Sequence, residues 1–390
     1  MTVITHLADL QKLARRRVPK MFYDYADSGS WTEQTYRANS SDFARIRLQQ
    51  KVAVNLEKRT LASTMLGAPV TMPLALAPTG MCGMQSADGE IKAARAANAF
   101  GIPFTLSTMS ICSVEAVAEA TKSPFWFQLY VMRDVEFSDR LIERARAAGC
   151  SALVLTLDLQ LLGQRHKDLK NDLTAPPRLT LKNIANMSTK WRWGLGMLGT
   201  KNRTFGNIVG HAKGVDNMNS LMEWTNDQFD LSLDWEAVKR IKKKWGGKLI
   251  LKGILNVEDA KLAVNSGADA IIVSNHGGRQ LDGAVSSVEM LPAIIDAVGD
   301  KIEVHVDGGI HSGQNMIKAV ALGAKGTYMG RPYLYALGAM GQAGVTKLLE
   351  IMKKEADVTM ALMGHSDIKN LSRADLIDPS VTLNPWMQPK

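Results

Sequence analysis

Short runs of apolar and β-branched residues recur along the middle of the chain, and segments with helical periodicity separate them. Each run has the length of a buried strand rather than of a helix. The runs cover residues 74–78, 104–108, 125–130, 152–158, 249–254, 270–275, 303–309 and 326–330. Strands that alternate with helices are typical of a parallel sheet, and eight such units predict an α/β fold of the (β/α)8 TIM barrel type.

The segments between the runs have the pattern of amphipathic helices. The segment after the first run places Ala93, Ala96, Ala97 and Phe100 on one face. Ser113 precedes the next helical segment and is a suitable N-cap. A doubly wound open sheet is the alternative, but no GxGxxG motif opens a helix after the first run, and eight parallel strands are unusual in such a sheet. The pattern therefore favours the barrel.

Two parts of the chain fall outside this repeat. Residues 1–70 precede the first run, and we expect them to form an N-terminal helical cap. Residues 159–232 form an unusually long insertion after the fourth run, and barrel insertions of this kind often serve as lids or docking segments. We therefore expect one domain over residues 1–390, with the barrel at 71–345 and a C-terminal helix and tail at 346–390.

Composition narrows the class of protein. A hydrophobic fraction of 46% and a charged fraction of 22% are those of a soluble globular protein. The chain shows neither a secretory signal nor an apolar run of transmembrane length. Cys82, Cys112 and Cys150 match no zinc or redox spacing, so we expect buried thiols, a reducing cytoplasmic compartment and no metal site. The net charge of +9 attracts anions, but no nucleic-acid motif accompanies it.

Polar residues gather where the predicted strands end. In a barrel the C-terminal ends of the strands meet at one face, which is where active sites lie, so these residues are expected to converge. Glycines and a cation after the last two strands are typical of a phosphate site. The polar and glycine residues at these ends are Thr79, Ser107, Gln128, Tyr130, Thr156, Asp158, Lys252, Ser274, His276, Arg279, Asp307, Gly308, Gly309, Gly330 and Arg331.

The residue types at these ends suit acid–base chemistry on an anionic substrate. His276 could take a proton, Asp158 could steady the resulting imidazolium, and Arg279 with Arg165 could grip an anion. Lys252 needs a negative partner on the inner rim and could balance a developing anion. Taken singly, each residue also has a structural reading, such as a core histidine or a helix cap, but their recurrence at one end of successive strands favours a site.

Several motifs together resemble those of a known family. They are "PKMFYDYADSG", "LALAPTGMCGM", "GIPFTLSTMSICSVE", "PFWFQLYVMRD", "LKGIL", "VSNHGGRQLDG" and "GRPYLYALGAMGQAG". The chain resembles the FMN-dependent L-2-hydroxy acid dehydrogenases and oxidases, and within them it is most similar to the bacterial membrane-associated L-lactate dehydrogenases. The resemblance implies oxidation of a small L-2-hydroxy acid, L-lactate to pyruvate above all, with electrons passed to quinone or another respiratory acceptor.

The resemblance also implies roles for individual residues. The family's catalytic base corresponds to His276, and the aspartate that supports it corresponds to Asp158. The residues expected to bind the substrate are Tyr25, Tyr130, Arg165 and Arg279. Lys252 is expected to stabilise the negative charge of reduced FMN. Flavin contacts fall on Pro78, Thr79, Gly80, Ser107, Gln128, Thr156, Lys252, Ser274, Asp307, Gly308, Gly309, His311, Gly330 and Arg331.

The sequence leaves some alternatives open. An oxidase that uses oxygen and a mandelate dehydrogenase with a wider pocket are close alternatives, and Met109 stands where it could limit substrate bulk. A phosphate-binding barrel without redox chemistry is a more distant one. The family that the chain resembles usually carries an arginine where this chain has His311. A neutral imidazole would bind the flavin more weakly or in a pH-dependent way. The alternative is that Arg331 and backbone amides suffice to bind the phosphate.

The segment 178–214 is basic and partly apolar. It holds seven Lys or Arg and no acidic residue, and Trp191 and Trp193 stand on either side of Arg192. Such a composition suits contact with anionic lipid, although a basic active-site lid is the alternative. We therefore expect peripheral association with the inner face of the cell membrane. The resemblance further suggests a homo-oligomer, a tetramer.

Overall fold

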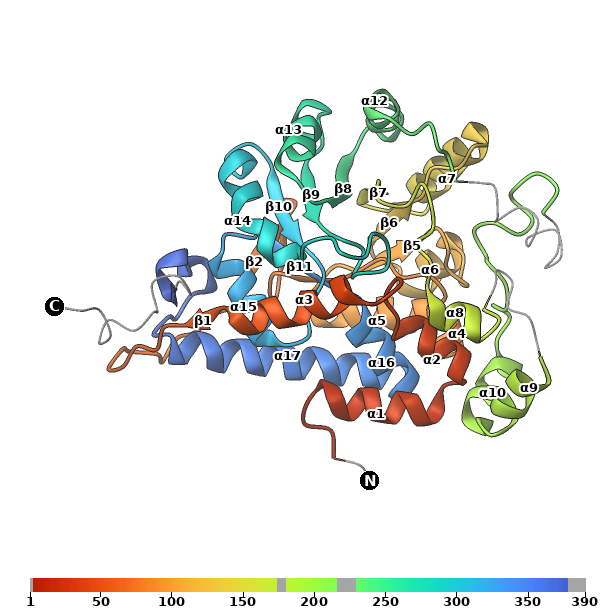
Figure 1. Ribbon diagram of the computed structural model, residues 1–390, viewed down its shortest axis with the longest axis horizontal. Coiled ribbons are helices and arrows are strands. Elements are labelled where there is room, and N and C mark those ends of the chain that lie inside the picture. Colours follow the sequence, from red (N-terminus) through yellow and green to blue (C-terminus); the bar gives the residue numbers. More distant parts are fainter. Residues whose placement is uncertain (1–2, 174–179, 216–228, 378–390) are drawn as a thin grey trace.

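A parallel barrel forms the centre of the molecule in the computed structural model, which describes residues 3–173, 180–215 and 229–377 (Figure 1). The strand order is β4-β11-β10-β9-β8-β7-β6-β5, and a parallel bridge between Leu76 and Phe104 joins its two ends. The fold class predicted from the pattern is therefore confirmed. The strands are β4 (Leu74–Leu76), β5 (Thr105–Ser107), β6 (Trp126–Leu129), β7 (Ala152–Thr156), β8 (Lys248–Ile254), β9 (Ala270–Val273), β10 (Glu303–Val306) and β11 (Gly326–Met329).

Helices follow the strands and cover the outside of the barrel (Figure 1). The expected N-cap is present, because the Ser113 hydroxyl accepts a hydrogen bond from the Ala116 N–H. The last helix, α17, packs against α15, α16 and α5. These helices are α4 (Cys82–Gln85), α5 (Gly89–Phe100), α6 (Val114–Thr121), α7 (Val135–Ala147), α12 (Trp235–Trp245), α13 (Val257–Asn265), α14 (Ser287–Val298), α15 (Gly313–Ala321), α16 (Arg331–Met340) and α17 (Gln342–Leu362).

Alternation along the strands separates two cores. In β7, Leu153 and Leu155 belong to the large core between strands and helices, whereas Val154 belongs to the smaller core inside the barrel. The same alternation brings Thr156 to the inner rim, where it pairs in register with Lys252 of β8. Because side chains of a strand point to opposite faces in turn, the last inward position of each strand faces the C-terminal mouth.

The N-terminal part joins the barrel at several places. Its helices are α1 (Leu7–Arg17), α2 (Lys20–Ala26) and α3 (Gln34–Arg45), and α1 packs against α16. Short strands accompany them: β1 (Arg47–Leu48) pairs with β12 (Leu376–Ile377), and β2 (Ser63–Met65) pairs with β3 (Ala68–Val70). Two 3-10 turns precede β12, at Ile368–Asn370 and Arg373–Asp375. The expected helical cap thus also contains strands, one of which pairs with a segment from the far end of the chain.

The insertion after β7 leaves the barrel and lies against the N-terminal helices. It contains α8 (His166–Lys170), α9 (Leu181–Ser188) and α10 (Trp191–Gly199), and residues 174–179 and 216–228 of the insertion lie outside the described part. The Trp193 indole donates to the Met84 carbonyl over 2.8 Å and stacks on Phe22 at 5.6 Å between ring centroids. Among the described residues, no helix has both the length and the apolar character needed to cross a membrane.

Candidate functional site

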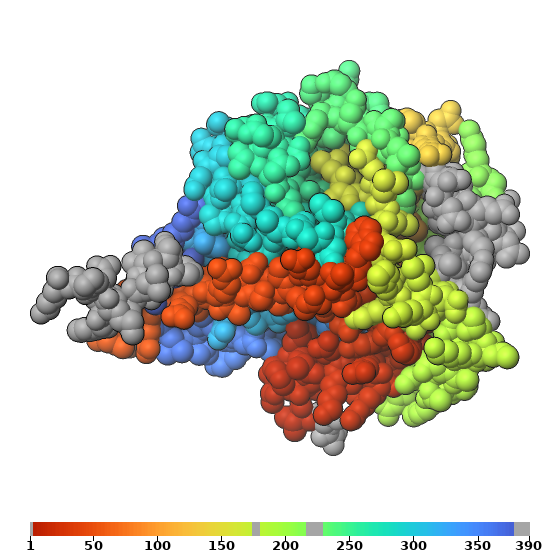
Figure 2. All heavy atoms as spheres, in the orientation of Figure 1, coloured from red at the N-terminus to blue at the C-terminus, as the bar shows by residue number. Residues whose placement is uncertain are grey.

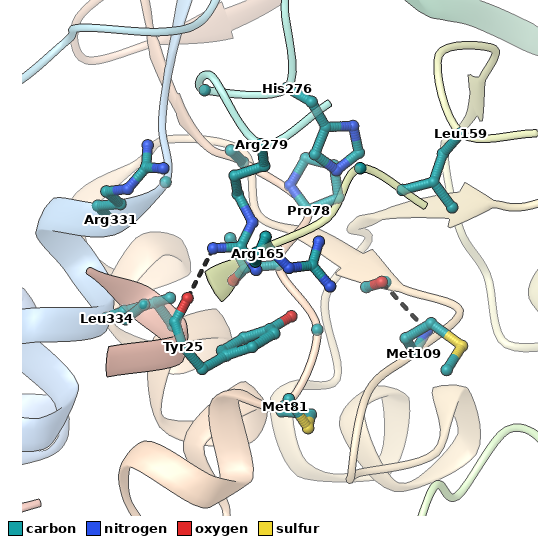
Figure 3. Close-up of a pocket in the computed structure, with 18 of the residues that line it drawn as sticks. Tyr25, Pro78, Met81, Met109, Leu159, Arg165, His276, Arg279, Arg331 and Leu334 are labelled. Carbon is teal, nitrogen blue, oxygen red and sulfur yellow. Dashed lines mark hydrogen bonds between the residues drawn. The ribbon is translucent and has the colours of Figure 1, made fainter. Parts of the chain in front are cut away.

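A cavity of about 580 Å³ opens at the C-terminal ends of the strands (Figure 3). Side chains from the N-terminal part, the barrel and the insertion all contribute to its wall. Of the residues predicted from the sequence, those that line it are Tyr25, Pro78, Thr79, Gly80, Ser107, Tyr130, Arg165, Lys252, His276, Arg279, Asp307, Gly308, Gly309, His311, Gly330 and Arg331. Asp158, Gln128, Thr156 and Ser274 lie just behind this wall, bonded to or beside lining residues.

The loop after β9 has an unusual backbone that presents His276 to the cavity. His276 has a φ of +57°, and Gly277 and Gly278 follow with φ of +63° and +71°. A positive φ is uncommon for a residue other than glycine and marks places where function constrains the chain. A Cβ on Gly278 would lie 2.4 Å from the Tyr36 nitrogen, so only glycine permits this close approach to α3.

His276 and Asp158 form a buried pair. The His276 Nδ1 and the Asp158 Oδ1 are 2.8 Å apart. Burial lowers the pKa of His276 and outweighs the attraction of Asp158, while Lys252 lowers it further. Burial alone would raise the pKa of Asp158, but His276 and Lys252 bring it below its usual value. At neutral pH the pair is therefore a neutral imidazole that donates from Nδ1 to a carboxylate, which leaves Nε2 with a free lone pair.

Lys252 stands at the inner rim between two carboxylates. Its Nζ lies 3.5 Å from Asp307 Oδ2 and 3.9 Å from Asp158 Oδ2, and it donates to the Ser274 hydroxyl over 3.1 Å. Burial opposes its charge, but Asp158 and Asp307 together raise its pKa above the ordinary value. The negative partners that the sequence required for Lys252 are therefore these two aspartates, and the lysine keeps a fixed positive charge in the site.

Arg165 and Arg279 reach the cavity from different segments (Figure 3). Arg279 donates to the Tyr25 carbonyl over 2.6 Å and to the Ser28 hydroxyl over 3.0 Å, and its guanidinium lies 4.6 Å from the centre of the Tyr25 ring. Burial and the neighbouring charge of Arg165 lower the pKa of Arg279 to about 10, so it remains charged at neutral pH. Arg165 is held by Asp168 over 2.6 Å. Two adjacent guanidinium groups in one cavity favour an anionic ligand.

Tyr130 faces the free nitrogen of His276. The Tyr130 hydroxyl lies 3.5 Å from His276 Nε2, and burial, the largest cause, raises the pKa of Tyr130 so that it stays protonated. Phe229 packs edge-on against the Tyr130 ring at 5.7 Å between centroids. The insertion therefore supplies part of the support for this tyrosine, through an aromatic contact that fixes the orientation of the ring.

Unpartnered buried polar atoms show where a polar ligand would fit. Among the described residues, the buried side-chain atoms without a hydrogen-bond partner include four at or beside the cavity: Gln128 Nε2, Thr156 Oγ1, Asp307 Oδ1 and Arg331 Nε. Native proteins leave few such atoms, and those that remain are usually satisfied by water, an ion or a ligand. All four belong to positions where the sequence resemblance places flavin contacts, so the residues present fit FMN.

The candidate phosphate end lies after β10 and β11. Gly308 and Gly309 have φ of +80° and +88°, and the Arg331 guanidinium lies 4.4 Å from the centre of the Tyr36 ring. A Cβ on Gly277 would lie 2.7 Å from the Arg331 guanidinium. Backbone amides of a glycine turn with a cation at a helix start form a suitable phosphate cradle. Burial, aided by Arg331, lowers the pKa of His311 to about 4, so this imidazole is neutral at ordinary pH.

Sequence reasoning missed several residues of the cavity. Asp168, which holds Arg165, stands three positions after it, at a spacing typical of neighbours on a helix, so the spacing could have found it. Phe205 and Phe229 come from the insertion, where no strand register indicates which side chains face inward. Gly253 has a φ of +106° and leaves room for Asp158, since a Cβ there would lie 2.7 Å from the Asp158 side chain.

Comparisons with known proteins agree with this architecture. Residues 14–378 match the family model described as FMN-dependent dehydrogenase. The chain is 42% identical to the L-lactate dehydrogenase of Caulobacter vibrioides over 377 residues, which covers 96% of this chain and 98% of that protein. It is also 42% identical to the L-lactate dehydrogenase of Actinobacillus pleuropneumoniae over 379 residues, with 97% and 99% covered.

The fold is also similar to those of solved structures. A crystal structure of the monotopic membrane protein (S)-mandelate dehydrogenase superposes with a TM-score of 0.92 at 35% identity and covers 96% of this chain and 100% of that one. The crystal structure of mandelate oxidase superposes with a TM-score of 0.81, also at 35% identity, with 96% and 98% covered. The fold and the site define an FMN-dependent oxidoreductase built on a TIM barrel. The chain belongs to the FMN-dependent dehydrogenase family, and its cofactor is FMN.

Proposed function

We propose that this enzyme oxidises a small L-2-hydroxy acid to the corresponding 2-keto acid, with L-lactate converted to pyruvate as its main reaction. The observation that carries the proposal is the neutral His276, held by Asp158 in the same cavity as Arg165 and Arg279. A proton acceptor beside paired cations suits a substrate with a carboxylate next to a carbinol. The L-lactate dehydrogenases that resemble the chain over nearly its whole length support this choice of substrate.

In this proposal, side chains of the cavity wall bind and orient the substrate. Arg165 and Arg279 bind the substrate carboxylate, and Asp168 and the Tyr25 carbonyl hold the two guanidinium groups in place. Tyr130 donates a hydrogen bond to the substrate oxygen, which its raised pKa permits. Bidentate binding of the carboxylate leaves the carbinol only a small range of positions, and this fixed orientation lowers the entropic part of the barrier.

His276 then takes the proton that leaves the substrate. Its Nε2 is the free acceptor, because Nδ1 donates to Asp158. As the imidazolium forms, the Asp158 carboxylate stabilises its charge without itself becoming protonated. FMN, when bound, supplies the two-electron acceptor of the reaction. Lys252 keeps a fixed positive charge at the rim to stabilise negative charge that develops beside it.

The reaction can be tested on the flavin itself. We expect the purified FMN-bound protein to be yellow and to bleach on anaerobic addition of L-lactate, whereas D-lactate leaves the colour unchanged. Stopped-flow absorbance with lactate and mandelate enantiomers measures the preference, and the thioether of Met109 in the cavity wall is expected to disfavour the aryl substrate. A protein that takes up no FMN, or that bleaches equally with both lactate enantiomers, contradicts the proposed function.

We further propose that the electrons pass to a quinone or another respiratory acceptor, and that α9 and α10 dock the enzyme to the inner face of the cell membrane. Trp191, Leu195 and Leu198 are 63%, 62% and 73% exposed and lie at helical spacing on one face of α10. In α9, Leu181 is 87% exposed whereas Asn183 is buried. Helices that turn apolar side chains outward and polar ones inward suit a membrane interface.

Replacing the outward apolar residues tests this docking. We expect Trp191→Ser/Leu195→Ser/Leu198→Ser to move the enzyme from the membrane pellet to the supernatant while turnover with a soluble dye stays within about twofold, because these exposed residues do not line the cavity. Leu281→Ser, at a 70% exposed leucine elsewhere, is the matched control and is expected to change nothing. Retention of the triple variant in the membrane pellet contradicts the assignment.

A further inference from the structure

The last turns of α1 carry a group of cations that the catalytic site does not use. We call Lys12, Arg15 and Arg16 the α1 cation cluster, and all three side chains are exposed. Among the residues that the structure describes, none of them pairs with a carboxylate within 4.0 Å. Basic residues in the last turn of a helix favour its dipole, which offers one reason for their presence. The helix dipole does not explain why the insertion brings further cations close to this end of α1.

The C-terminal end of α1, which carries the α1 cation cluster, contacts the insertion. The Lys190 ammonium donates to the Arg16 carbonyl over 2.9 Å. The backbone N–H of Lys20, just after α1, donates to the Asn186 side chain of α9 over 2.7 Å. Arg192 approaches Arg17 closely enough to lower its pKa, together with burial, which is the larger cause. The N-terminal helices and the insertion, which are far apart in the sequence, adjoin at the surface of the molecule (Figure 2).

Bringing these like charges together opposes folding of the insertion onto α1 unless an anion compensates. Lys182, Arg192 and Lys201 of the insertion are also exposed, and the described residues pair none of them with a carboxylate. The outward apolar face of α10 includes Trp191 and Leu195, and the Arg192 guanidinium lies 5.1 Å from the centre of the Trp191 ring. Apolar residues flanked by unpaired cations match the layered chemistry of a bilayer surface, with acyl chains beneath anionic headgroups.

We propose that the α1 cation cluster binds the anionic headgroups of the membrane into which the apolar face of α9 and α10 inserts. This inference rests on the proposed membrane docking and extends the docking surface from the insertion to the N-terminal helix. The occupant is an anionic phospholipid, since the cluster offers charge without the buried polar groups that a soluble phosphate ligand would require. Headgroup attraction then selects anionic membranes, and the apolar residues supply affinity for any bilayer.

Charge-neutral variants of the FMN-bound enzyme test the inference. Binding is measured by sedimentation with phosphatidylcholine vesicles and with the same vesicles containing phosphatidylglycerol. We expect Arg15→Gln/Arg16→Gln to weaken partition onto the anionic vesicles by roughly tenfold or more, and to leave binding to the neutral ones unchanged. The matched control is Lys239→Gln/Lys243→Gln on α12, at the opposite edge of the molecule, which changes the net charge equally (Figure 1).

The outcomes separate the two proposals. Unchanged turnover with a soluble dye, unfolding temperature and FMN content in both double variants show that only the surface was altered. Equal weakening by the two double variants overturns the inference, because it shows a response to net charge alone. Full anionic binding by Arg15→Gln/Arg16→Gln overturns it while leaving the docking through α10 intact. A wild-type enzyme that binds neither kind of vesicle overturns the membrane docking and the inference together.

Discussion

The protonation state of His276 is set by its burial and by three charged neighbours, Asp158, Lys252 and Asp307. Burial, the largest cause, and the positive charge of Lys252 lower its pKa, whereas Asp158 and, to a smaller extent, Asp307 raise it. The outcome is an imidazole that is neutral at lower pH than a free histidine would be. Because a base acts only when it is unprotonated, this balance extends the pH range in which His276 can accept a proton.

This balance gives a pH dependence whose sign follows from the structure. Substrate oxidation is expected to be full above the pKa of His276 and to fall only as the pH drops through that value, below the ordinary 6.5. Asp158→Asn removes the larger of the two influences that raise the pKa of His276, so the acid limb of kcat/KM moves to still lower pH. Loss of the carboxylate is also expected to reduce kcat by roughly 10²-fold or more. A wild-type acid limb at or above 6.5, measured with a soluble dye, contradicts this account.

His311 stands at the proposed phosphate end of the cavity, where the sequence resemblance leads us to expect an arginine. Burial and Arg331 lower its pKa to about 4, so at neutral pH it offers a hydrogen bond rather than a charge. The fixed positive charge at this end of the cavity then comes from Arg331, whose Nε is buried and unpartnered. In the proposed phosphate site, Arg331 and the amides near Gly308 and Gly309 therefore carry most of the attraction.

At the scale of the element, β8 carries a local irregularity that serves the site. Its pairing with β9 shifts register between Lys252 and Ile254, and Gly253 at the shift has a φ of +106°. The bulge lets Asp158 lie against the strand while Lys252 still points to the inner rim. Bulges are common beside active sites, and this one follows directly after the lysine that balances two aspartates.

Substitution of Gly253 tests this role. Gly253→Ala places a Cβ 2.7 Å from the Asp158 side chain in a backbone conformation that disfavours alanine, and we expect it to cost roughly 2 kcal/mol or more of stability. Gly267→Ala, where φ is +80° but nothing lies within 4 Å, is the matched control and carries only the backbone cost. Thermal unfolding measures both variants. Equal Tm losses would show that the contact with Asp158 is unimportant.

At the scale of the whole molecule, local periodicity was enough to predict the barrel. Every strand from β4 to β11 overlaps a run identified in the sequence, because buried parallel strands and amphipathic helices have different periods. The polar residues at the strand ends converge because parallel strands share one carboxyl end. Because an unpaired buried charge is costly, the sequence predicted that Lys252 has a negative partner. It did not show that the partners are Asp158 and Asp307.

The parts that the sequence could not predict depend on contacts between distant segments. The pairing of β1 with β12 joins residues 47–48 to the last described strand, more than 300 residues further along the chain, and nothing local indicates that partner. The contribution of Phe205 and Phe229 to the cavity depends on how a long insertion folds back, which has no repeating pattern. The contact of α1 with the insertion is of the same kind. Tertiary packing, rather than local preference, decides such features.

The central claim is that His276 accepts the substrate proton, and His276→Gln in the FMN-bound enzyme tests it most directly. Glutamine keeps a polar side chain of similar size but cannot act as a base at neutral pH. Anaerobic stopped-flow bleaching with L-lactate, alongside measurement of FMN affinity, separates chemistry from cofactor binding. We expect FMN affinity to stay within about threefold and the bleaching rate to fall by roughly 10²- to 10⁴-fold. Bleaching at the wild-type rate would contradict the assignment of His276 as the proton acceptor.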